Sequence, residues 1–171
     1  MVGNPKPYEK MTDDEQTNAR AIANARIQAL IAAKAQLLHI AVDAAEAGDT
    51  DLEEQCHRDA ENLEREKMLA EDQRTAMVEG GVNVSPPNAT EVAQVQAAVS
   101  AVRNLNNNAL MFNAVLTTVH AATTTALGIL KPTAADTGLP VTGGTAATGG
   151  GATAPAGGGA AAPAAGGGKD R

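Results

Sequence analysis

A chain of 171 residues with one Phe, one Tyr and no Trp has little side-chain area for a deep core, because alanine supplies much of its 43% hydrophobic content. Its net charge of −7 argues against a nucleic-acid partner, since phosphate binding depends on clustered Lys and Arg. Long helices packed along shared stripes suit this composition, and partner chains would add the burial that one chain lacks. We therefore predict an all-α fold and no nucleic-acid partner.

The first segment, residues 1–11, is predicted to be a flexible leader, because Pro5 and Pro7 oppose regular structure. Its sequence "MVGNPKPYEK" has no apolar run after the charges, so no secretory signal is expected. The single cysteine, Cys56, excludes a disulfide framework within the chain and is compatible with a reducing compartment. These features together predict a cytoplasmic protein.

A first helix is predicted to begin after Thr12, where Thr12 and Glu15 form a capping-box pattern, and to stop at Gly48. Steps of three and four residues place most of its apolar positions on one face. These positions are Ile22, Ile27, Leu30, Ile31, Leu37, Leu38, Ala41, Val42 and Ala45.

A second helix is predicted from Thr50, with Glu53 completing the capping-box pattern, to about Glu79 before Gly80. It completes a charged helical hairpin over residues 12–79. Its narrow stripe has a period of seven residues, which is typical of packing against a neighbouring helix. The stripe includes Cys56, Leu63, Ala70 and Met77. The remaining charges indicate a solvated surface or, alternatively, an acidic docking face.

Residues 80–88 are predicted to form a Gly/Pro hinge, and residues 89–131 to form one long helix capped by Asn88 and Glu91. The apolar steps of this helix change phase at Val102, which is the pattern of a coiled-coil stammer. The Gly- and Ala-rich residues 132–171 are predicted to be a disordered tail, because they have little side-chain area to offset their ordering entropy.

The pattern of reactive side chains predicts no enzyme, no cofactor and no metal site. His39, His57 and His120 fall on three different predicted helices without ligand spacing. His39 is expected to be partly buried, His57 exposed, and His120 paired with a polar group across a helix interface. A pH-sensitive contact of His120 is the alternative. Cys56 is expected to be a small buried hydrophobe.

Residues 104–130 contain no charge, and three environments suit such a run. The length permits a membrane span, although Asn113 and His120 would then lie in hydrocarbon. The second environment is the core of a single-chain three-helix bundle. The third is a contact with other copies, which would cover a second apolar stripe that includes Met111, Val115, Ala122 and Ile129. The predicted association seam consists of Leu105, Ala109, Phe112, Leu116, Val119, Thr123, Ala126 and Leu130.

The elements "NALMFNAV" at 108–115 and "AATTTALGIL" at 121–130 resemble the small helical subunits of R-bodies, the killing-trait family. The resemblance extends over about residues 92–131. It implies a protein that assembles with copies or paralogues into coiled ribbons inside bacteria.

The sequence therefore predicts a non-catalytic, self-associating helical structural protein of bacterial or phage origin, with R-body-like assembly as its specific form. Its partners would be further copies of the chain or paralogous helical subunits. Membrane contact is possible without being constitutive. The alternatives are a secreted effector or translocator whose uncharged helix inserts into membranes, and a soluble adaptor that docks through its acidic hairpin.

Overall fold

The computed structural model describes residues 4–105 and 109–134, all of which belong to one compact unit. The described residues are mainly helical, which confirms the all-α class. The helices are α1 (Asp13–Ala47), α2 (Thr50–Val78), α3 (Ala89–Arg103) and α4 (Phe112–Leu130), with short 3-10 turns η1 (Tyr8–Lys10) and η2 (Ala109–Met111). The strands are β1 (Lys6–Pro7), β2 (Val82–Val84) and β3 (Thr133–Ala134).

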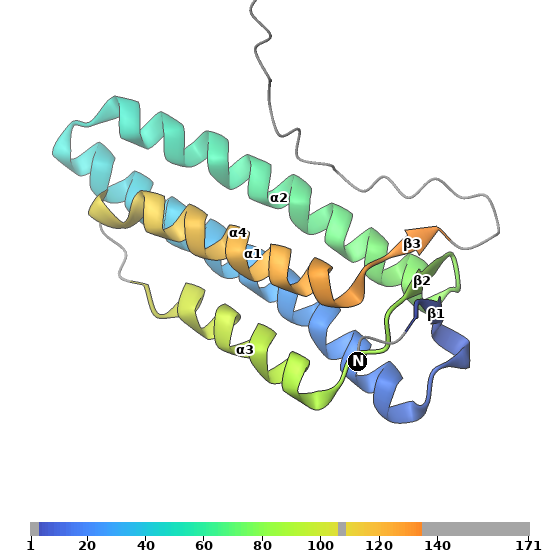
Figure 1. Ribbon diagram of the computed structural model, residues 1–171. Coiled ribbons are helices and arrows are strands. Elements are labelled where there is room, and N and C mark those ends of the chain that lie inside the picture. Colours follow the sequence, from blue (N-terminus) through green and yellow to red (C-terminus); the bar gives the residue numbers. More distant parts are fainter. Residues whose placement is uncertain (1–3, 106–108, 135–171) are drawn as a thin grey trace, which may run out of the picture. The chain divides into compact units, whose positions relative to one another are not determined.

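Helix α1 is the centre of the bundle, because each of the other three helices packs against it (Figure 1). Helices α1 and α3 run in one direction, and α2 and α4 run in the other (Figure 1). The largest buried side chains of α1 point into this core. They include Ile22, Leu30, Leu37 and Ile40, none of which has exposed surface.

The predicted hairpin is formed, and capping residues near the helix ends determine where α1 and α2 begin and where α1 stops. Thr12 Oγ1 accepts a hydrogen bond from the Glu15 backbone amide at 3.3 Å, and a Glu15 carboxylate oxygen accepts one from the Thr12 amide at 2.8 Å. Helix α1 ends at Gly48, whose φ of +77° is favourable for glycine. The prediction that Thr50 caps the second helix is wrong. Asp49 is the cap, and its side chain accepts from the Leu52 amide at 3.1 Å.

The prediction of one continuous helix over residues 89–131 is also wrong. Asn88 caps α3 together with Glu91 as expected, but α3 ends at Arg103 and α4 begins at Phe112. Asparagine is a poor helix former, costing about 0.6 kcal/mol relative to alanine, and four asparagines occur between residues 104 and 108. Folding back lets both halves of the segment bury apolar side chains against α1.

A side chain from α1 satisfies the end of α3. Gln36 is 6% exposed, and its Nε2 donates to the backbone carbonyls of Val102 and Leu105. The last carbonyls of a helix have no partners within the helix itself. Gln36 therefore stabilises the point at which the chain leaves α3.

The predicted flexible leader and the predicted Gly/Pro hinge are both ordered where the structure describes them. Strand β2 pairs antiparallel with β1 on one side and with β3 on the other, placing Lys6 opposite Val84 and Val82 opposite Ala134. Val82 and Val84 are buried, so their backbone groups need partners, which the two flanking strands provide. Thr133 and Ala134, assigned to the tail by prediction, form β3. The predicted disorder of the remaining tail lies outside the described residues.

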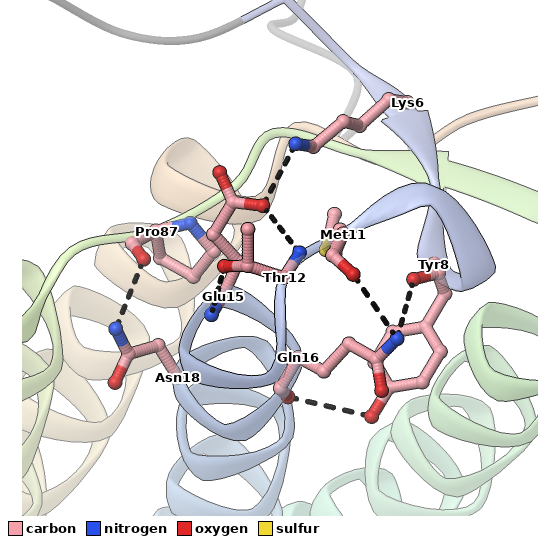
Figure 2. A network of polar contacts seen from close by, with 8 residues as sticks. All are labelled: Lys6, Tyr8, Met11, Thr12, Glu15, Gln16, Asn18 and Pro87. Carbon is pink, nitrogen blue, oxygen red and sulfur yellow. Dashed lines mark hydrogen bonds and ion pairs between the residues drawn. The ribbon is translucent and has the colours of Figure 1, made fainter.

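Side-chain contacts fix the leader to the start of α1 (Figure 2). The Lys6 ammonium donates to Glu15 at 2.7 Å, and this bond lowers the pKa of the Glu15 carboxyl. The Gln16 amide donates to the Tyr8 and Met11 carbonyls at 3.2 and 3.3 Å, and Tyr8 and Met11 are only 4% and 6% exposed. Asn18 links α1 to the segment before α3 by donating to the Pro87 carbonyl at 3.1 Å. These residues hold the leader as part of the core.

Candidate association surface

The chain's own helices cover the predicted association seam of α4. Its buried members are Phe112, Val119, Thr123, Ala126 and Leu130. Leu105 and Leu116 are partly buried against the same core, and Ala109 lies in η2. Association through α4 stays a prediction, and it would require α4 to leave the bundle first.

The second apolar stripe of α4 is covered as well. Val115 and Ala122 have no exposed surface, while Met111 and Ile129 are partly buried. The sequence predicts one apolar face on the first helix and a narrow stripe on the second. Helix α1 covers more than expected, because its buried positions spread over a wide face towards α2, α3 and α4.

The histidines do not form a site. His120 is exposed on α4, and among the described hydrogen bonds it contributes only its backbone carbonyl, which accepts from Thr123 Oγ1 at 3.0 Å. The predicted interface contact of His120 is therefore not made within the described residues. His39 is exposed, contrary to its prediction, and His57 is exposed as predicted. No group of three or more His, Cys, Asp or Glu side chains in the described ranges is arranged to hold a metal ion.

Cys56 is buried on the seven-residue stripe of α2, which confirms its prediction. Burial raises the pKa of the Cys56 thiol, and the charge of Asp59 acts in the same direction. A raised pKa reduces the thiolate fraction that nucleophilic chemistry needs. The other members of this stripe, Leu63, Ala70 and Met77, are also buried. The narrow stripe of α2 is thus a contact within the chain.

A small apolar cavity lies between α1, α2, β2 and α4. Its volume is about 20 Å³, which is room for roughly one water molecule. Arg26 lines it and donates to the side-chain oxygen of Gln73. Burial lowers the pKa of the Arg26 guanidinium, with the charge of Glu66 opposing the shift. The cavity is too small for an organic substrate.

The exposed surface of α1 carries a second stripe, four members of which (Ile31, Leu38, Val42 and Ala45) are among the apolar positions predicted for this helix from its sequence. We call it the outer stripe, and its residues follow alternating steps of four and three. They are Asn24, Gln28, Ile31, Ala35, Leu38, Val42 and Ala45. The large members Ile31, Leu38 and Val42 are 41%, 37% and 57% exposed. The apolar residues of α1 therefore occupy two adjacent stripes, and the bundle covers only one.

The outer stripe is also free of charge. The structure describes all of α1, and its exposed residues between positions 21 and 42 are the stripe residues and His39. The two basic residues in this span do not belong to the stripe. Arg26 faces the cavity, and Lys34 pairs with Glu64 of α2 at 3.0 Å. An uncharged, exposed heptad stripe is the pattern by which one helix packs against another.

Polar contacts from the neighbouring helices border one end of the outer stripe. Arg74 of α2 donates to the Asn24 side-chain oxygen at 3.0 Å, and Arg103 of α3 donates to the Gln28 side-chain oxygen at 3.0 Å. Helix α3 ends at Arg103, and the α1 residue bonded to the backbone carbonyls at the end of α3 is Gln36, so the stripe residues from Leu38 onward lie beyond that contact.

An acidic tip borders the other end of the outer stripe. It comprises Asp43, Glu46, Asp49, Asp51, Glu53 and Glu54, and no Lys or Arg occurs between Lys34 and Arg58. Five of these six acids are exposed, and Glu53 is half-buried. The outer stripe thus runs from two arginines to a cluster of carboxylates.

Comparison of the chain with protein-family models, with curated proteins and with solved structures found no match. The geometry of the described residues therefore carries the functional argument.

Helix α1 is the only helix in the described part of the chain that is long and apolar enough to cross a membrane by length and composition. Half of its most apolar window is buried inside the bundle. From the sequence alone, the uncharged residues 104–130 are instead the segment whose length permits a membrane span.

Proposed function

We propose that this chain is a non-catalytic structural protein that acts by self-association, with the outer stripe of α1 as the contact between copies. The observation that carries the proposal is the row of exposed, uncharged side chains at heptad spacing, centred on Leu38. Exposed apolar rows are costly for a monomer in water, and a second helix with the same row covers them.

A second copy of the chain suits this row better than a different protein does. The row contains no charged residue that would select an oppositely charged partner, and its heptad spacing suits knobs-into-holes packing. Two copies of one surface can meet about a two-fold axis, which is the commonest symmetry of soluble oligomers. The proposal includes a cytoplasmic location and, as its finer form, an R-body-like assembly, which rests on the sequence elements at 108–115 and 121–130.

Analytical ultracentrifugation of the full chain over about 1 to 100 µM tests the proposal. The expected result is a mass that rises with concentration in the wild type and stays monomeric in Leu38→Asp, because an unpaired charge in a helix contact costs several kcal/mol. Thr117→Asp is the matched control, since Thr117 is exposed on α4 away from the outer stripe. A wild type that remains monomeric throughout would refute the proposal.

A membrane role for α1 is the second candidate, favoured by its length and hydropathy. It would require α1 to leave the core, where Ile22 and Leu30 are fully buried. Flotation with anionic and neutral liposomes separates the two candidates, because self-association through a folded bundle predicts no lipid binding at neutral pH. An adaptor role of the acidic tip would instead appear as capture of a basic partner that weakens with salt.

A further inference from the structure

The two ends of the outer stripe carry opposite charge. Arg103 and Arg74 lie beside Gln28 and Asn24 at the end nearer the start of α1. Glu46 and the rest of the acidic tip follow the last stripe residue, Ala45. This polarity restricts how two copies can meet.

A parallel pairing of two outer stripes would place the acidic tips side by side, with no Lys or Arg between Lys34 and Arg58 to offset them. Like charges in contact oppose association, whereas complementary charges select an orientation. An antiparallel pairing brings each acidic tip to the arginines of the other copy. Two-fold symmetry repeats this contact at both ends.

We propose that two copies of this chain pair antiparallel along the outer stripe, with Arg103 of each copy beside Glu46 of the other. This inference rests on the proposed function and adds its orientation and register. The two-fold axis passes α1 between Ala35 and Leu38. In this arrangement the basic end of each stripe meets the acidic tip of the other copy.

The register follows from the heptad positions. In an antiparallel helix pair, each first-type heptad position packs against a second-type position of the partner helix. Placing Ile31 opposite Val42 also places Ala35 opposite Leu38 and Gln28 opposite Ala45. Two of these layers combine a larger side chain with alanine, and the third joins the β-branched side chains of Ile31 and Val42. The same register brings Arg103, which is bonded to Gln28, next to Glu46.

Cysteine cross-linking tests the orientation directly in the full chain. Ile31→Cys and Val42→Cys are each made with Cys56→Ala and checked for folding by circular dichroism. The proteins are then oxidised with copper phenanthroline, alone and mixed. In the proposed register, residue 31 lies about 16 Å along the helix from residue 31 of the other copy, well beyond the roughly 7 Å that a disulfide spans. The expected result is a covalent dimer in the mixture and none in either variant alone.

Other outcomes overturn the inference in distinguishable ways. Covalent dimers from each variant alone would establish a parallel pairing, which removes the orientation and leaves the proposed function standing. Dimers seen by sedimentation without cross-linking in any mixture would place the contact elsewhere. A monomer by sedimentation removes the inference together with the proposed function.

Charge reversal tests the end contacts independently. Arg103→Glu is expected to weaken the dimer roughly tenfold, because two exposed contacts per dimer change from attraction to repulsion. Adding Glu46→Arg to the same chain is expected to restore most of the affinity, since each copy then carries both reversed partners. Lys10→Glu makes the same change in net charge at an exposed site beyond the stripe and should leave the affinity within about twofold. Equal weakening by Arg103→Glu and Lys10→Glu, or no rescue, would overturn the proposed contact.

Discussion

The outer stripe of α1 and the seam of α4 follow the same alternating steps of three and four, yet they have different surroundings in the folded chain. Val119 and Ala126 of α4 are at most 3% exposed, whereas Ile31 and Val42 of α1 are 41% and 57% exposed. A heptad period therefore identifies a helix face that needs a partner, but it does not say whether the partner is in the same chain. The following variants test that distinction.

The largest expected effect is a charge on the covered helix. Val115 has no exposed surface, so Val115→Asp would bury an unpaired carboxylate and should lower the free energy of unfolding by about 3–5 kcal/mol. Urea unfolding followed by circular dichroism measures the change. Thr117→Asp, two residues away on the exposed side, should change the free energy by less than about 0.5 kcal/mol. Equal effects at the two positions would contradict the placement of α4.

A smaller effect is expected where α1 holds the end of α3. Gln36→Ala removes the donor to the carbonyls of Val102 and Leu105 and leaves the buried Val102 carbonyl without this partner, at a cost of about 1–2 kcal/mol. Hydrogen exchange of the last amides of α3 should become faster than in the wild type. Gln96→Ala, at an exposed position of α3, serves as the control. Unchanged exchange in Gln36→Ala would show that the break between α3 and α4 does not depend on Gln36.

A pH effect is expected at the border of the outer stripe. Hydrogen bonds from Lys34 and Lys67 lower the pKa of the Glu64 carboxyl below its ordinary value of 4.5. A lowered pKa in the folded state means that the ionised carboxylate stabilises the fold above that value, and the contribution is lost as pH falls through the lowered pKa. The free energy of unfolding should therefore fall less between pH 7 and pH values below 4.5 in Glu64→Gln than in the wild type.

Lys34→Met provides the reciprocal test, because it removes the Lys34 ammonium that donates to Glu64 and leaves the carboxyl itself unchanged. It should reduce the same acid dependence. An unchanged dependence in both variants would assign the acid sensitivity to other carboxylates.

The smallest effect is expected on the exposed helix face. Leu38→Gln, measured at a concentration where the chain is monomeric, should change the free energy of unfolding by at most about 0.5 kcal/mol, because Leu38 is already 37% exposed. A loss above about 2 kcal/mol would mean that Leu38 is part of the core of the single chain. The contrast with Val115→Asp separates a face used within the chain from one left for a partner.

Local chemistry in the sequence determined where most helices begin and end. The capping boxes at Thr12 and Asn88 and the glycine after α1 appear in the structure where they were predicted. The seven-residue stripe containing Cys56 identified the buried face of α2. These signals act over a few residues, so a single sequence is sufficient to read them.

Features that depend on contacts between residues far apart in the chain became visible only in the folded structure. At the fold back between α3 and α4, the end of α3 is bonded by Gln36, which is 66 residues from Val102 in the chain. The strand at Val82–Val84 exists because segments from both ends of the described chain pair with it. The sequence of α1 contains both stripes. Which stripe is buried depends on where α2, α3 and α4 pack around α1. Once α2, α3 and α4 had covered the first stripe, the second was left facing solvent.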